Sequence, residues 1–176
     1  MSGHNKWSKI KHKKAATDSE RSKIFGKYAR SIAVESKKSG GDIYAPGLRL
    51  AIERARKENM PNENIERAIA KGKADTGVSL EAVTYETYGP GGTALIIEGF
   101  TDNSNRTSQE IKHLLSQHGA TLAQPGSALW AFVKQDGEWV PQTTVSLSEG
   151  DREKIERLKE SLEEHDDVQD VYTNAV

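Results

Sequence analysis

The chain has 176 residues, of which 35% are hydrophobic and 29% charged, and this suits one large domain or two small ones with compact cores. The absence of cysteine excludes disulfides, thiolate catalysis and cysteine-ligated zinc. No apolar run approaches the roughly 20 residues of a membrane span, and the N-terminus lacks the apolar core of a secretory signal, so we expect a cytoplasmic protein without a membrane partner.

The net charge of −1 conceals an uneven distribution. Residues 1–73 carry 18 Lys and Arg against 8 Asp and Glu, a net charge of +10, whereas residues 74–176 carry 7 against 18, a net charge of −11. Such a chain can bind a polyanion with its basic part and hold the acidic part away. The basic part is therefore the predicted contact surface.

The first fourteen residues combine five lysines and two histidines with one aromatic ring, and they contain no carboxylate. A segment this charged cannot fold alone, so we expect a mobile or half-ordered arm. Lysines around a flat ring suit a phosphate backbone with an unstacked base nearby, and a solubilising tail is the alternative. The predicted nucleic-acid contacts are His4, Lys6, Trp7, Lys9, Lys11, His12, Lys13 and Lys14.

Three short helices are predicted after the arm, which together indicate a basic helical domain over residues 1–73. The first is capped by Thr17 or Asp18, the second opens at Pro46, and the third ends before Gly72. The first helix continues the basic track of the arm. Its predicted contacts are Arg21, Lys23, Lys27 and Arg30.

The hydrophobic period changes from helical to alternating in the second predicted domain, residues 78–176. Alternating segments separated by turns and two helical stretches indicate an α+β domain. From the second strand on, the order β-α-β-β-α-β indicates a ferredoxin-like sandwich with one extra N-terminal strand. The strands are expected at 83–87, 93–100, 127–133, 140–147 and 168–172, with a glycine-rich hairpin turn at 88–92 and an Asp-Gly turn at 136–137.

The sequence offers no converging catalytic residues, so we expect a protein that is not an enzyme and needs no cofactor or metal. His113 and His118 are five residues apart on one predicted helix, an offset that does not place them on one face as in metal-binding helices. The polar segment after the second strand has two interpretations. It is a helix cap, with Thr107 as a possible capping residue, or a secondary RNA or protein contact through Asn103, Asn105 and Arg106.

Several stretches together resemble the YebC family of bacterial proteins, whose mitochondrial relatives are translational activators of a cytochrome oxidase subunit. The resemblance runs from Ser2 to the C-terminus. Its motifs are the arm through Asp18, Asn59-Met-Pro61 with the helix after it, Tyr88-Gly-Pro-Gly-Gly92, Thr101-Asp-Asn103 with Asn105-Arg-Thr107, and Pro141-Gln-Thr-Thr144.

The resemblance implies either a DNA-binding transcriptional regulator or a factor that helps the ribosome through difficult stretches such as proline runs. It also implies a short form, because family members usually insert a third, acidic domain where this chain has a turn at residues 135–139.

The basic residues favour RNA over DNA. The second and third helices loosely resemble a helix-turn-helix, but the third offers only Arg67, Lys71 and Lys73, mixed with glutamates, for reading base edges. Lysines around one indole suit folded RNA, in which bases are splayed. We therefore expect a monomer that binds ribosomal RNA or the ribosome, with DNA as the alternative partner and no small-molecule substrate.

Overall fold

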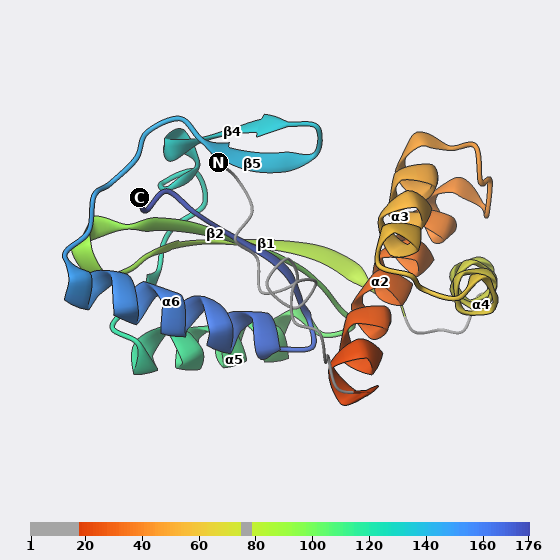
Figure 1. Cartoon of the computed structure of the whole chain (residues 1–176), viewed down its shortest axis with the longest axis horizontal. Coiled ribbons are helices and arrows are strands. Elements are labelled where there is room, and N and C mark those ends of the chain that lie inside the picture. Colours follow the sequence, from red (N-terminus) through yellow and green to blue (C-terminus); the bar gives the residue numbers. More distant parts are fainter. Residues whose placement is uncertain (1–17, 75–78) are drawn as a thin grey trace. The chain divides into compact units, whose positions relative to one another are not determined.

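The computed structural model describes residues 18–74 and 79–176, which divide after Glu81 into two compact units. The first is helical and the second is an α/β sandwich (Figure 1). Within the described residues, no helix is both long and apolar enough to cross a membrane.

The helical unit contains α2 (Asp18–Ser39), α3 (Pro46–Lys57) and α4 (Asn62–Lys73), as the apolar spacing predicts. The last helix runs one residue beyond the predicted stop at Gly72. This glycine permits close packing, because a Cβ there would lie 2.3 Å from the carbonyl oxygen of Ala33 in α2. The core consists of Ile32, Leu48, Ala51, Ile52, Ala55, Met60, Ile65 and Ala68.

The sandwich is built on a four-stranded sheet with the order β3-β1-β2-β6. Its strands are β1 (Glu81–Tyr88), β2 (Ala94–Thr101), β3 (Thr121–Leu122) and β6 (Val168–Thr173). A turn that contains the 3-10 segment η1 (Pro90–Gly92) joins β1 to β2. Strand β6 is antiparallel to β2, and β3 is antiparallel to β1.

Two layers cover the sheet, one on each face. Helices α5 (Ser104–Gln117) and α6 (Glu149–Glu164) pack on one face, where Leu95 and Ile97 of β2 are buried. Ala94 and Ile96 point to the other face, which is covered by η2 (Leu129–Ala131) and the hairpin of β4 (Phe132–Gln135) and β5 (Glu138–Pro141). Figure 1 shows the two helices on the side of the sheet opposite this hairpin. The apolar run of β2 is explained by burial on both faces.

The α+β class is confirmed, but the strands take different roles from those predicted. The segments 127–133 and 140–147 do not join the main sheet; only residues 132–135 and 138–141 form strands, and these pair with each other. The strand predicted as an extra one, β1, lies in the middle of the sheet. The short strand β3 was not predicted, because two residues are too few to show a period of two.

The predicted Asp-Gly turn is confirmed. Asp136 has φ of 51° and Gly137 has φ of 86°, the positive values of a two-residue hairpin loop. Gln135 pairs with Glu138 on either side of this loop, and Phe132 pairs with Pro141 at the far end of the hairpin. The hairpin therefore closes tightly within the second unit.

Candidate nucleic-acid interface

The predicted binding set lies only partly within the described residues. His4, Lys6, Trp7, Lys9, Lys11, His12, Lys13 and Lys14 precede the first described residue, so their contacts stay a prediction. In α2, Arg21 and Lys23 are exposed, and within the described chain neither has a carboxylate partner.

The remaining two predicted contacts in α2 are less accessible. Lys27 is only 5% exposed, and Arg30 is half-buried. Both residues already take part in interactions within the chain. A lysine can bury its aliphatic stem while its ammonium group stays near water, but a contact with phosphate needs an accessible ammonium group. The structure therefore places Arg21 and Lys23, and not Lys27, where a polyanion can reach them.

Four cations outside the predicted set are exposed on α3 and α4. They occupy the last turns of these helices, and no carboxylate of the described residues pairs with them. A cation in the last turn stabilises the helix because it lies at the negative end of the helix dipole. The position of these four cations is therefore explained by helix stability and does not by itself indicate a binding site. The signal in the sequence was the basic ending shared by both helices. The four are Arg56, Lys57, Lys71 and Lys73.

Other cations of the helical unit are paired locally. Arg49 lies 3.9 Å from Glu53, and Lys38 lies 2.6 Å from Glu35. Exposed pairs of this kind contribute less than about 1 kcal/mol each, so they do not prevent an exchange for phosphate. The unpaired cations carry the net positive charge of the unit.

Helix α4, which would be the recognition helix for DNA, has few side chains that can contact base edges. Helix α4 has Glu63 in its first turn and no cation there, although this is the part of a recognition helix that meets the bases. Arg67 binds Glu63 at 3.0 Å. Its guanidinium would have to leave that carboxylate before it could contact guanine, and this agrees with the expectation from sequence that α4 reads few base edges.

In the sandwich, the predicted secondary contact lies at the start of α5. Asn103 is the N-cap, and its side chain accepts a hydrogen bond from the backbone nitrogen of Arg106 at 3.0 Å. The possible cap at Thr107 was wrong, since Thr107 lies inside the helix and is buried. Asn105 is exposed. Of the three predicted residues, it is the one whose side chain has no interaction within the described chain.

Arg106 is the centre of an ion network. Its guanidinium lies 2.8 Å from Asp102 and 2.9 Å from Asp167. Hydrogen bonds to Asp167 and then to Asp102 raise the pKa of Arg106 above its ordinary value. Asp167 is 4% exposed and also accepts a hydrogen bond from Thr107 at 2.7 Å. This network ties the start of α5 to the segment before β6.

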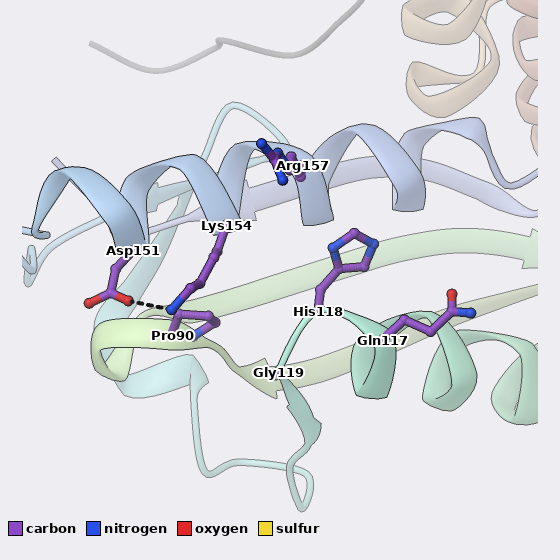
Figure 2. Close-up of a pocket in the computed structure, with 7 residues that line it drawn as sticks. All are labelled: Pro90, Gln117, His118, Gly119, Asp151, Lys154 and Arg157. Atoms are coloured by element: carbon purple, nitrogen blue, oxygen red, sulfur yellow. Dashed lines mark hydrogen bonds and ion pairs between the residues drawn. The ribbon is translucent and has the colours of Figure 1, made fainter.

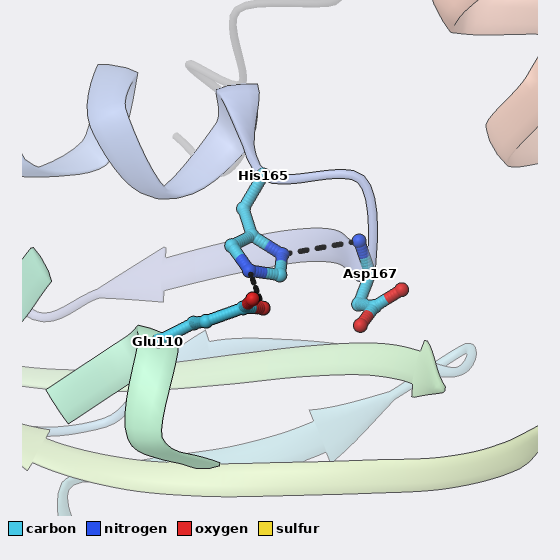
Figure 3. A group of neighbouring side chains, drawn as sticks. All are labelled: Glu110, His165 and Asp167. Atoms are coloured by element: carbon cyan, nitrogen blue, oxygen red, sulfur yellow. Dashed lines mark hydrogen bonds and ion pairs between the residues drawn. The ribbon is translucent and has the colours of Figure 1, made fainter. Parts of the chain in front are cut away.

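Glu110, His165 and Asp167 lie close enough to suggest a metal site (Figure 3). However, their ligand atoms are used by the protein. Glu110 lies 2.9 Å from Nε2 of His165, whose Nδ1 accepts a hydrogen bond from the backbone nitrogen of Asp167 at 3.1 Å. Arg106 already supplies positive charge to both carboxylates. The geometry favours a structural network over a metal centre.

A cavity of about 490 Å³ lies between the end of α5 and the first turns of α6 (Figure 2). Its cations are matched locally, since Lys154 lies 3.4 Å from Asp151 and Arg157 binds Glu153. His118, the C-cap of α5, contacts the hydroxyl of Ser161 at 3.0 Å, a pair that the sequence did not reveal. Within the described residues His118 has no carboxylate partner, so the pair lacks the third group that orients a catalytic histidine.

Comparisons with known proteins match two family models to successive parts of the chain. Residues 5–75 match the family model described as the TACO1/YebC protein N-terminal domain. Residues 80–138 and 133–175 match the model described as the TACO1/YebC second and third domain. The chain belongs to the TACO1/YebC family.

Relatives in this family are longer than the present chain. A protein of Thermosipho melanesiensis is 38% identical over 235 positions, which cover 99% of this chain and 93% of that protein. The comparison with a protein of Thermotoga maritima gives 38% over 236 positions, with the same shares. Both are named probable transcriptional regulatory proteins. An alignment of 235 positions exceeds the 176 residues here by 59, so the relatives carry residues without a counterpart in this chain.

The solved family structure supports the fold. The crystal structure of the conserved hypothetical protein Aq1575 from Aquifex aeolicus matches with a TM-score of 0.84 and 34% identity. The match covers 98% of this chain and 97% of that one. The fold expected from the resemblance to the YebC family is thereby confirmed.

Proposed function

We propose that this TACO1/YebC protein is an RNA-binding translation factor that docks on ribosomal RNA through its arm and its helical unit. The observation that carries the proposal is the separation of charge, with net charges of +10 for residues 1–73 and −11 for residues 74–176. Seven exposed cations of α2, α3 and α4 have no carboxylate partner among the described residues, which fits a surface that binds phosphates. They are Arg21, Lys23, Lys37, Arg56, Lys57, Lys71 and Lys73.

Two features favour folded RNA over duplex DNA. The first turn of α4 lacks cations and Arg67 is paired with Glu63, so this helix has little with which to read a major groove. The arm carries Trp7 among lysines, and an indole stacks on a base that is not already stacked in a duplex. Ribosomal RNA offers both crowded phosphates and splayed bases.

The proposed factor makes and breaks no bond. It would bias the geometry of reacting groups that the ribosome supplies, and this kind of positioning changes reaction rates without a catalytic residue of its own. The acidic sandwich would act as a lever or contact a ribosomal protein. Elongation through proline runs is the step we expect the factor to assist, in the cytoplasm.

We also propose where the longer relatives carry the residues that this short chain lacks. The two ranges that match the second family model overlap over residues 133–138, which contain the turn between β4 and β5. This overlap supports the idea that the longer relatives carry their additional residues at this turn. Closing the hairpin with two residues costs little entropy, because the strands already pair in register.

The salt dependence of ribosome binding tests the electrostatic part of the proposal. With about five phosphates contacted, the logarithm of the binding constant should fall against the logarithm of the salt concentration with a slope of about −3.5 to −4.5. Sedimentation with ribosomes over a series of KCl concentrations measures this slope. A binding constant that does not change with salt contradicts the proposal.

Transcriptional regulation is the second candidate, favoured by the names given to the relatives and by the short connection between α3 and α4. It predicts a defined duplex bound more tightly than random duplex by at least about 10³-fold. Competition between a genomic library of duplex fragments and ribosomes distinguishes the two candidates. If the protein binds one duplex fragment and does not bind ribosomes, the result supports the transcriptional regulator.

A further inference from the structure

The loop between α2 and α3 exposes a large aromatic side chain on the helical unit. Tyr44 is 82% exposed, more than any other exposed large hydrophobic residue of the described chain. Its neighbour Ile43 is 49% exposed, and Leu50 in the first turns of α3 is 41% exposed. Single exposed apolar residues are ordinary on protein surfaces, so the meaning of Tyr44 depends on its surroundings.

The loop holds Tyr44 in place through its backbone. Gly40 and Gly41 adopt positive φ values of 64° and 84°, and the backbone nitrogen of Gly41 donates to the carbonyl of Ser36 at 2.8 Å. The backbone nitrogen of Tyr44 donates to the Asp42 side chain at 3.0 Å. Pro46 then fixes the start of α3. The exposed ring is therefore attached to an ordered turn, which lowers the entropy lost when a ligand binds it.

A cation lies against the same loop. A Cβ on Gly41 would meet the Cδ atom of Lys73 at 2.4 Å, so the side chain of Lys73 crosses directly over this glycine. Within the described residues, no carboxylate pairs with Lys73. Lys37 and Lys38 end α2 immediately before the loop. Lys38 is paired with Glu35 and Lys37 donates to the hydroxyl of Ser79, so Lys73 is the cation at this loop that has no partner among the described residues.

We propose that Tyr44 is a stacking platform for an unpaired RNA base and that Lys73 contacts the adjoining phosphate. An exposed aromatic ring and an unpaired lysine at one loop have the composition of sites that bind single-stranded nucleic acid, in which the ring stacks on the base and the ammonium contacts the backbone. A paired base in a duplex already has both faces stacked, so the site selects splayed bases. This inference rests on the proposed function, since it names a point of contact within RNA binding.

The test compares full-length variants in binding to a fluorescent 12-nucleotide single-stranded RNA and to a duplex RNA of equal length. Tyr44→Ala should weaken single-strand binding about tenfold, within the range of aromatic-to-alanine changes at stacking sites, whereas Tyr44→Phe should bind as the parent protein does. Duplex binding should not change. Ile43→Ala is the matched control, because it removes an exposed apolar side chain from the same loop without removing a ring.

The salt series separates the two roles. Tyr44→Ala should leave the slope of log affinity against log salt unchanged, because stacking releases few ions, whereas Lys73→Ala should reduce the magnitude of this slope by about 0.7.

If Tyr44→Ala binds single-stranded RNA as tightly as the parent protein does, the stacking proposal is overturned, while the proposal of RNA binding stays intact. If Tyr44→Ala no longer sediments with ribosomes but binds RNA normally, the stacking proposal is also overturned, and the ring is assigned to a protein contact. No RNA binding by the parent protein at low salt overturns the proposed function as well.

Discussion

Replacement of Lys9, Lys11, Lys13 and Lys14 by alanine is expected to abolish sedimentation with ribosomes. Each lysine that neutralises a phosphate releases counterions, so the loss of four such contacts lowers affinity by several orders of magnitude at moderate salt. Among the residues that the structure describes, the buried hydrophobic residues begin at Ile24, so we expect the fold to be retained. Sedimentation of ribosomes with the purified variant measures binding, and circular dichroism measures the fold.

The control removes the same charge from the acidic unit. Lys112, Lys134, Lys154 and Arg157 are exposed there, and their replacement by alanine also lowers the net charge by four. We expect this second variant to bind ribosomes as the parent protein does. Equal binding by both variants would remove the arm from the mechanism, and equal loss in both would show that total charge, and not its position, determines affinity.

Replacement of Glu86 by alanine is expected to destabilise the sandwich strongly. Glu86 is 6% exposed, and its carboxylate accepts hydrogen bonds from the backbone nitrogens of Ala128 at 2.7 Å and Leu129 at 3.0 Å, as well as from that of Gly126. Donors left without an acceptor cost about 1–3 kcal/mol each, so we expect a loss of about 3–5 kcal/mol. The melting temperature of this unit should fall by more than about 12 °C.

Glu98→Ala is the control for this prediction. Its carboxylate, on the neighbouring strand β2, accepts from the Trp139 side chain at 2.8 Å and pairs with Lys134 at 3.1 Å, but it holds no buried backbone donor. We expect a loss of about 1 kcal/mol. Chemical denaturation monitored by tryptophan fluorescence measures both variants. A loss below about 1 kcal/mol for Glu86→Ala would show that the carboxylate does not hold the loop.

The helices could be predicted well because their signals are local. Apolar spacing, Pro46 at the start of α3 and Ser148 before α6 each act within one or two turns. Ser148 caps α6 by accepting from the backbone nitrogen of Asp151 at 3.2 Å. The division of the chain into a basic and an acidic part was likewise visible from composition alone.

The strands around residue 130 could not be predicted because their positions depend on a distant residue. Glu86 lies in an alternating strand and has the sequence signature of a solvent-facing position. In the structure it binds the backbone of residues 126–129, which then form a loop and the segment η2 and do not pair as a strand. The partnership spans about forty residues, and no periodicity reports it.

The candidate site was predicted in part for a similar reason. Sequence identified Arg21 and Lys23, which are exposed, but it gave no sign that Lys27 is buried. It also did not link Lys73 to the loop that carries Tyr44, because that contact joins residues about thirty positions apart. Burial and tertiary contacts determine which cations can reach a phosphate.

Ribosome profiling in a strain that lacks this protein tests the central claim most directly. If the basic part acts on ribosomal RNA during elongation, ribosomes should accumulate at proline runs in the deletion strain, and the parent gene should restore normal occupancy where the four-lysine arm variant does not. Unchanged ribosome occupancy, together with altered transcript levels from a defined set of promoters, would contradict the account.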